Sequence, residues 1–211
     1  MIQIKNRFTG TVILEGAFGT VAELISANSG SNLSYSDLKG SNLSYTDLKG
    51  SNLSYSDLSG SNLSYTDLSG SNLSYSDLKG SNLSYTDLSY SDIKGSNLSY
   101  TDLKGSNLSY TDLSGSNLSG SNLKGSNFSY TKSGDLIISA IYSIGPIGSR
   151  SDYLQCWAFD NGDRQYKTGC FSGTESEFIA AVSAHGIEKH KTDYMAAIAF
   201  FNAILEVQNN G

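Results

Sequence analysis

The chain has 211 residues, with 14 basic and 20 acidic side chains and a formal net charge of −6. The two signs are interspersed along the chain, which excludes a basic nucleic-acid-binding patch and a dense acidic tail. The longest apolar run, Met195 to Phe201, is far too short to span a bilayer, and the first ten residues lack the apolar segment of a signal peptide. We therefore expect a cytoplasmic protein with no membrane or nucleic-acid partner.

Residues 1–30 predict a small N-terminal cap. Isoleucines alternate with polar residues over 2–4, and a Thr-Gly turn then leads to an apolar stretch over 12–14, a pattern typical of a hairpin. Thr20 followed by Glu23 forms a capping box, which predicts the start of a short helix.

Residues 31–130 repeat with a period of five. An apolar residue occupies every fifth position from Leu33 to Phe128, giving twenty positions without a slip. This period matches neither the 3.6 of a helix nor the two of a strand, so it predicts a solenoid whose turns bury these side chains against one another. The expected core includes Leu33, Leu38, Leu43, Leu48, Leu53, Leu58, Leu73, Leu88, Ile93, Leu98, Leu113 and Phe128.

The individual units, such as "SNLSY" and "TDLKG", resemble the pentapeptide-repeat family, although Ser or Thr replaces the Ala that is commonest two residues before the central Leu. The resemblance implies a mainly β fold: a right-handed quadrilateral β-helix of about five coils, each with four pentapeptides. The segments on either side of the repeats resemble those of phage and prophage pentapeptide-repeat proteins. A phage-derived chain would act in the host cytoplasm, and the near-identical units would equally suit consensus engineering.

The segment "TDLSYSDIKG" at residues 86–95 interrupts a longer ten-residue pattern, because Tyr90 stands where Gly is due. In steps of five there is no interruption, since Leu88 is followed by Ile93 and then Leu98. We therefore expect the solenoid to continue through this point while its surface residues move to adjacent faces. With four units per coil, the expected surface rows are Tyr35, Tyr55 and Tyr75; Tyr45, Tyr65 and Tyr85; and Asp37, Asp57 and Asp77.

Residues 131–211 contain no repeat and predict an α+β domain of two or three strands followed by two helices. An Asn-Gly turn at 161–162 indicates a hairpin. Thr174 with Glu177 begins one helix. A second helix over 191–208 would place Tyr194, Ile198, Phe201 and Leu205 on one face.

Two surface features of the repeats have alternative interpretations. The Asp rows could imitate DNA phosphates, but nine Asp are interspersed with six Lys in residues 31–130, and Asp and Asn commonly bind the local backbone in turns. The Tyr rows could bind rings, sugars or a protein, or the rings could simply stack on one another. In both cases we favour the structural interpretation.

No set of residues predicts catalysis. His185 and His190 lack further metal ligands, Cys156 and Cys170 do not lie opposite each other in the expected hairpin, and residues 145–150 lack a phosphate-loop ending. We therefore expect no catalytic, cofactor-binding or metal-binding residues. The sequence favours a non-enzymatic scaffold, structural or protein-binding, with a partner or second copy bound through the C-terminal domain. The alternative is a DNA mimic that inhibits or protects bacterial DNA gyrase or topoisomerase.

Overall fold

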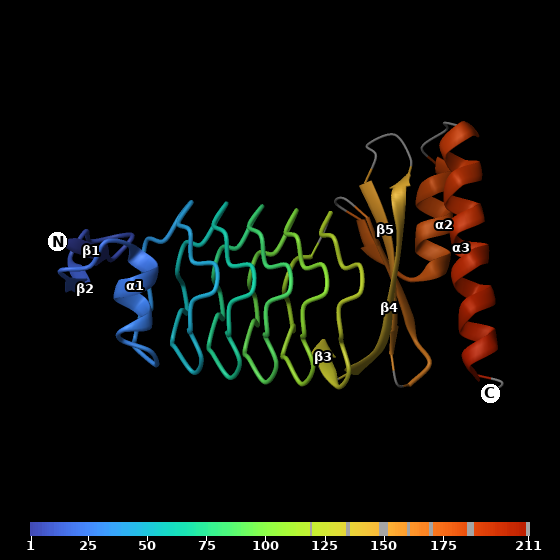
Figure 1. Cartoon of the computed structure of the whole chain (residues 1–211). Helices are drawn as coiled ribbons and strands as arrows, with labels where there is room; N and C mark the ends of the chain where they lie inside the picture. The colour runs from blue at the N-terminus through green and yellow to red at the C-terminus, as the bar shows by residue number, and fades with distance from the viewer. Residues whose placement is uncertain are drawn as a thin grey trace. The chain divides into compact units, whose positions relative to one another are not determined.

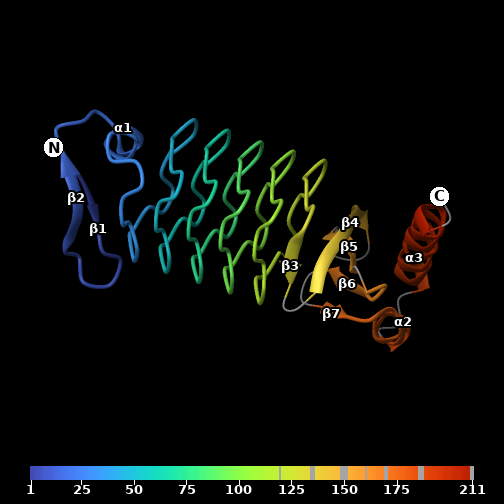
Figure 2. The ribbon, with the colours of Figure 1, turned by 90° about the horizontal axis from the view of Figure 1, so that it is seen from below.

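The computed structural model describes residues 1–118, 120–133, 136–147, 152–159, 161–168, 171–184 and 188–209. The chain divides into two compact units, Met1–Ile138 and Ser139–Gly211. Figure 1 and Figure 2 show the stacked coils of the first unit and the sheet with two helices of the second.

The first unit begins with a hairpin and a short helix. Strand β1 (Ile2–Lys5) pairs antiparallel with β2 (Val12–Gly16), and helix α1 (Val21–Ser26) follows. The Thr20 hydroxyl accepts a hydrogen bond from the Glu23 amide at 3.1 Å. The Glu23 carboxylate reaches back one residue further than a standard capping box would, to the Gly19 amide at 2.9 Å.

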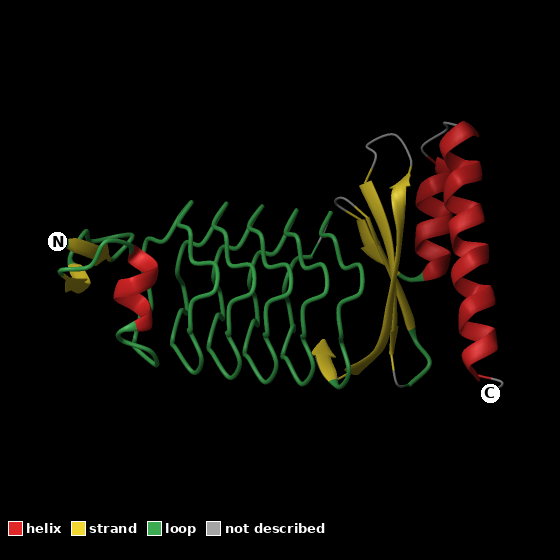
Figure 3. Ribbon diagram, viewed as in Figure 1, coloured by secondary structure: helices red, strands yellow, loops and turns green. Residues whose placement is uncertain are grey.

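Residues 31–132 form a β-helix in which the backbone returns to an equivalent position after twenty residues. Parallel bridges join residues twenty apart, from Asn32 with Asn52 to Asp112 with Lys132. The backbone amide of the central residue donates to a carbonyl of the next coil, as the Leu53 amide does to the Asn72 carbonyl at 2.7 Å. Figure 3 draws these coils as loop, because each bridge involves a single residue of each coil.

The central apolar residues fill the interior of the coils. From Leu33 to Leu118 none is more than 2% exposed, and Leu123 and Phe128 at the end of the series reach 6% and 7%. Ser or Thr two positions earlier also points inward, and its hydroxyl donates to a Leu carbonyl, as Ser76 does to Leu53 at 2.7 Å. Inward hydroxyls are therefore tolerated because the backbone accepts their hydrogen bonds.

Two buried hydroxyls of the described residues lack a protein partner, those of Thr46 and Ser51. Thr46 lies in the first coil, and Ser51 begins the second. Later inward hydroxyls commonly bond a carbonyl 23 residues earlier, in the preceding coil, as Thr66 does to Leu43 at 2.8 Å. For Thr46 and Ser51 the position 23 residues earlier falls before the repeats, so no Leu carbonyl of a preceding coil is there to accept.

Each corner of the coil is a tight turn with a left-handed residue. The amide of Ser56 donates to the Leu53 carbonyl at 3.2 Å, and Tyr55 between them has a φ of 59°. Ten tyrosines of the repeats share this conformation, and Gly takes the same place in most other units. A left-handed conformation costs a non-glycine residue about 1–2 kcal/mol, which favourable interactions elsewhere in the fold must offset.

The ladder continues without interruption through residues 86–95. The backbone amide of Leu88 donates to the Asn107 carbonyl at 2.7 Å, and that of Ile93 donates to the Asp112 carbonyl at 2.9 Å. Both side chains are no more than 1% exposed. The change in the ten-residue pattern therefore alters the surface of the column but not its backbone or core.

Both ends of the column are joined to other strands of the same unit. At the N-terminal end Asn6 forms a bridge with Ser36. The backbone amide of Arg7 donates to the Tyr35 carbonyl at 2.8 Å, and the backbone amide of Asp37 donates to the Lys5 carbonyl at 2.9 Å. At the other end β3 (Thr131–Ser133) pairs antiparallel with the start of β4 (Leu136–Ile147). Pairing of this kind occupies edge groups that would otherwise be free to bind other chains.

The second unit contains an antiparallel sheet and two helices. Its strands lie in the order β4-β5-β6-β7, where β5 is Asp152–Phe159, β6 is Arg164–Thr168 and β7 is Phe171–Gly173. Helices α2 (Glu175–Ala184) and α3 (Glu188–Asn209) pack on each other; α2 contacts β6 and β7, and α3 contacts β5. The sequence predicted two or three strands in residues 131–211, where the structure has five; β3 and β7, with three residues each, are too short to give a periodic signal.

The core of this unit lies between the sheet and the helices. Leu154, Cys156 and Ala158 alternate along β5 and pack with Phe178 of α2 and with α3. On α3, Ile198 and Phe201 are buried and Tyr194 is partly buried, whereas the Leu205 side chain lies outside the described residues.

Replacing one central leucine tests the role of the core. Leu73→Ala should lower the free energy of unfolding by about 2–5 kcal/mol, because it removes a fully buried side chain from a packed interior. Lys79→Ala, in the same coil but exposed, should change it by less than about 0.5 kcal/mol. Urea denaturation measures both, and equal losses would contradict a Leu-dependent core.

Candidate functional site

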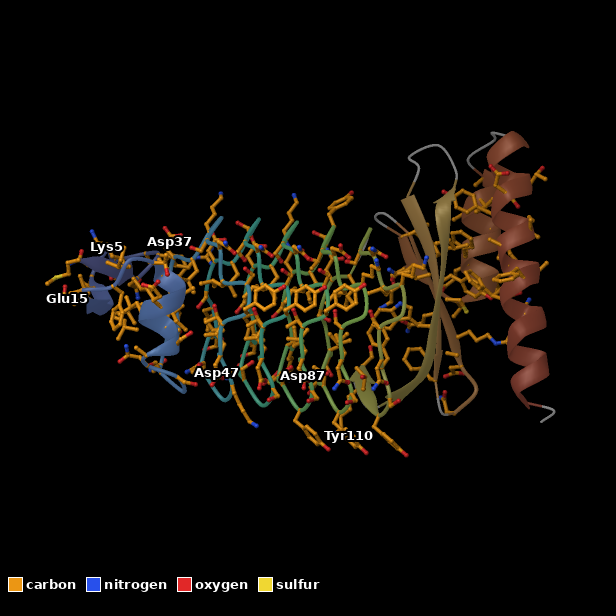
Figure 4. All side chains as sticks on the ribbon, in the orientation of Figure 1. Lys5, Glu15, Asp37, Asp47, Asp87 and Tyr110 are labelled. Carbon is orange, nitrogen blue, oxygen red and sulfur yellow. The ribbon has the colours of Figure 1, made fainter. Side chains whose placement is uncertain are left out.

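The surface of the column carries rows of identical side chains, because residues twenty apart occupy equivalent positions. Asp37, Asp57 and Asp77 form one such row, and Asp57 bridges the other two. Their Oδ1 atoms accept hydrogen bonds from the amides two residues later, at 2.9 Å from Ser59 and 3.1 Å from Lys79. In Figure 4, Asp47 and Asp87 lie along one edge of the coils. These carboxylates are therefore engaged in shaping the turns.

The two rows of three carboxylates, Asp37 to Asp77 and Asp47 to Asp87, each end on an asparagine. The Asn97 side-chain amide donates to Asp77 Oδ1 at 3.2 Å, and that of Asn107 donates to Asp87 at the same distance. Both asparagines follow the pattern change at Tyr90, which puts Asn where the ten-residue pattern would put Asp. The pattern change thus limits each of these rows to three like charges and supplies a donor at its end.

Asp57 is contacted both by its own turn and by the N-terminal hairpin. Partial burial pushes its pKa up, but hydrogen bonds from the Ser59 hydroxyl and amide, together with the positive charge of Arg7, outweigh burial and leave the pKa lowered. Arg7 Nη2 lies 3.9 Å from Asp57 Oδ2, and Arg7 Nη1 donates to the Tyr55 carbonyl at 3.2 Å. The N-terminal hairpin is therefore anchored to the second coil as well as to the first.

The tyrosines of the repeats form three stacks. In the first half of the column, rings of Tyr35, Tyr55 and Tyr75 stack with centroids 5.0 and 5.1 Å apart, and those of Tyr45, Tyr65 and Tyr85 stack at 5.0 Å. After the pattern change, Tyr90, Tyr110 and Tyr130 stack at 4.7 and 4.8 Å. Stacking of this kind supplies the interaction that offsets the left-handed backbone of these residues.

The stacks in the first half have defined ends. The ring of Tyr75 lies over Gly95, where an added Cβ would come within 2.6 Å of it, and Tyr85 lies over Gly105 in the same way at 2.7 Å. The Lys104 amine is 5.7 Å from the centre of the Tyr85 ring, and the Phe8 ring meets Tyr35 edge-on. Most ring faces are thus already covered, so the stacks present mainly ring edges and hydroxyls to a ligand.

The second unit contains a polar cluster that the sequence did not predict. The Tyr166 hydroxyl donates to Glu175 Oε2 at 3.0 Å, and the side-chain amide of Asn202 donates to Glu175 Oε1 at 3.1 Å. Arg164 Nη1 donates to Asn202 Oδ1 at 2.6 Å. Because these residues come from β6, α2 and α3, no local motif could reveal them. The groups bind one another, which suits a structural role for the cluster.

Burial alters two potential nucleophiles of this unit in opposite ways. It raises the pKa of the Cys156 thiol to about 11, so the thiol stays protonated and unreactive at neutral pH. It lowers the pKa of Lys167 to about 8. The Lys167 amine lies 3.3 Å from the centre of the Trp157 ring, whose N–H donates to Gln155 at 3.1 Å. The Trp157 ring stabilises the charged form of the Lys167 amine and so opposes the lowering of its pKa by burial.

The remaining sequence candidates give no site. His185, Cys170 and residues 148–150 lie outside the described residues, as does the side chain of His190. Among the residues that the structure does describe, no three His, Cys, Asp or Glu side chains gather into a metal-binding group. Within that same part of the chain, no helix combines the length and the apolar character needed to cross a membrane.

Comparison with known families identifies the column. The family model "Pentapeptide repeats" matches residues 31–64, 61–99 and 96–132 in eight copies. The chain therefore belongs to the pentapeptide-repeat family, as the resemblance of its five-residue units predicted. A search of curated protein sequences finds no match.

Solved structures similar to this chain are themselves pentapeptide repeat proteins. One from the cyanobacterium Cyanothece 51142 is 33% identical over 44% of this chain, with a TM-score of 0.42, and the match spans 62% of that protein. One from the Arabidopsis thaliana thylakoid lumen is 26% identical over 57% of this chain and 78% of its own length, with a TM-score of 0.33. QnrB1, a plasmid-mediated fluoroquinolone resistance protein, is 22% identical over 46% of this chain and 62% of its own, with a TM-score of 0.27.

The asparagine at the end of an Asp row can be tested by charge. Asn97→Asp would remove the donor to Asp77 and place a fourth carboxylate in the row, at a repulsive cost of about 1 kcal/mol. In the variant, repulsion raises the folded-state pKa of the introduced carboxyl above its unfolded value. The loss of stability should therefore be full at pH 7 and disappear below about pH 4, where the carboxyls are protonated in both states.

Asn62→Asp provides the matched control, because Asn62 also donates to a neighbour in its row but has asparagines on both sides. It should lose less stability at pH 7 and show a weaker pH dependence. Urea denaturation at both pH values measures the difference, and identical pH profiles for the two variants would contradict the assigned role of Asn97.

Proposed function

We propose that this pentapeptide-repeat protein is a non-enzymatic scaffold that binds a second protein chain through α3. The observation that carries the proposal is the distribution of apolar side chains around this helix. Ile198 and Phe201 face the core, while Met195 and Phe200 are 37% and 51% exposed on the opposite side. Ala196 and Ala199 lie between these two exposed residues and are exposed as well. An exposed apolar strip of this kind is typical of a binding surface.

The proposal includes the finer architecture of the chain. We infer a right-handed quadrilateral β-helix with four pentapeptides per coil and about five coils, which bridges between residues twenty apart support. An α+β domain would follow it and would present α3 to the partner. A cytoplasmic location belongs to the same proposal, and the buried, unpaired thiol of Cys156 is consistent with it.

The surface chemistry of the column favours a structural role over a catalytic one. Many of its Asp and Asn side chains bind their own turns, many of its inward Ser and Thr hydroxyls bond Leu carbonyls, and most of its tyrosines stack on one another. Few groups of the column are therefore left to bind or activate a substrate. The second unit, in contrast, has varied side chains and the exposed strip of α3.

The alternative, a DNA mimic that acts on gyrase or topoisomerase, receives less support. Such a mimic needs an extended negative field. Here the Asp rows are broken by Asn97 and Asn107, and lysines such as Lys39, Lys79 and Lys94 are interspersed with the acidic residues. Surface charges of opposite sign this close together largely cancel at a distance beyond the Debye length of about 8 Å.

Photo-crosslinking tests the binding surface. A photoreactive phenylalanine analogue at position 200 should form a covalent adduct in cells that produce the chain, because Phe200 lies in the exposed strip of α3. The same analogue at position 8, where Phe8 is 72% exposed in the N-terminal hairpin, is the matched control and should form far less. Gel mobility gives the mass of the adduct, and mass spectrometry identifies the partner in it.

The mass of the adduct separates the two kinds of partner. An adduct of twice the chain mass would identify a second copy, and another mass would identify a different protein. Equal labelling at positions 200 and 8, or no adduct at position 200, would contradict the proposal.

A further inference from the structure

The stacked tyrosines bring chemically reactive rings close together across neighbouring coils. The six pairs have centroids 4.7–5.1 Å apart and interplanar angles of 2–14°. Both members of a pair occupy equivalent positions of the repeat, so each ring carbon ortho to the hydroxyl lies about one coil spacing from its counterpart. Each stack thus brings three phenol rings together, one from each of three successive coils.

These rings are also open to reagents in solution. Tyr90, Tyr110 and Tyr130 are 66%, 48% and 59% exposed. Exposed side chains change rotamer on a picosecond to nanosecond timescale, so neighbouring rings can tilt out of the stack and approach each other at their edges. Proximity and access are the two conditions for coupling between side chains.

We propose that the tyrosine stacks are sites of oxidative cross-linking, at which a peroxidase with hydrogen peroxide joins tyrosines twenty residues apart into dityrosine. Each phenol loses one electron and one proton to give a tyrosyl radical. Two radicals form a carbon–carbon bond between their ortho carbons, and the two ring hydrogens at that bond move to the oxygens to restore the phenols. Hydrogen peroxide takes up the two electrons and two protons and becomes water.

The product would be a covalent staple between coils of one chain. Each bond would close a loop of twenty residues, as a disulfide would, and would restrict the unfolded chain. The oxidised monomer should therefore unfold at a higher temperature than the untreated protein. This inference does not depend on the proposed partner of α3.

The chain contains its own control in Tyr100. This ring is 56% exposed, comparable with Tyr110, and has the same left-handed backbone. Its neighbours twenty residues away are Gly80 and Gly120, so it has no tyrosine at the stacking position. Random oxidation would treat Tyr100 like the others, whereas stack-directed coupling would pass it over.

Treatment of the full chain with peroxidase and hydrogen peroxide, followed by denaturation and tryptic digestion, tests the proposal. Cleavage after lysine separates peptides 80–94, 95–104, 105–124 and 125–132, which carry Tyr90, Tyr100, Tyr110 and Tyr130 respectively; Tyr85 shares the first. Mass spectrometry should find 105–124 joined to 80–94 and to 125–132, each pair lighter by two hydrogen atoms. Peptide 95–104 should stay unlinked.

Two substitutions sharpen the test, and both keep an aromatic ring so that stacking persists. Tyr110→Phe should abolish both links of peptide 105–124 while leaving the link that joins 50–79 to 80–94 through Tyr65 and Tyr85. Tyr100→Phe should leave all links unchanged. Links to Tyr100 as frequent as those to Tyr110, cross-linking only between separate chains, or no dityrosine at all would overturn the proposal.

Discussion

The parallel hydrogen-bond ladder between residues twenty apart is the constraint on which the column depends. It can form only if every unit has the same length, because one missing or extra residue would move all later donors away from their acceptors. The five-residue step satisfies this requirement and places a buried Leu at the same point of each unit. The other positions follow from it: an inward hydroxyl two residues before, and a left-handed turn residue two residues after.

The ladder also determines how the surface is used. Residues twenty apart are neighbours in adjacent coils and are often of the same type. A favourable pair such as two tyrosine rings is therefore repeated along the column, and so is an unfavourable pair such as two carboxylates. The change of pattern at Tyr90 acts on both. It ends two Tyr stacks over Gly95 and Gly105 and ends two Asp rows on asparagine donors, without disturbing the Leu core. The surface rows therefore depend on the ten-residue pattern, whereas the fold depends only on the five-residue step.

Much of the column could be predicted from sequence because its determinants recur. The Leu series alone indicated a solenoid, and the units resembled the family to which the chain belongs. Other features need spatial information. The contact of Arg7 with Asp57 joins segments fifty residues apart, and the cluster of Tyr166, Glu175 and Asn202 gathers three elements. The left-handed conformation of Tyr55 and its equivalents was likewise not predicted, since tyrosine carries no local signal for it.

Deletion of part of one unit tests most directly whether the five-residue step governs the fold. Removing residues 61–65 keeps Leu58 and Leu68 five apart, whereas removing 61–64 leaves them six apart. The first variant should unfold cooperatively in urea with a loss of about 2 kcal/mol, the value of one buried Leu. The second should lose several times more, because its ladder loses register. Equal losses in the two variants, or a smaller loss for the four-residue deletion, would contradict the account.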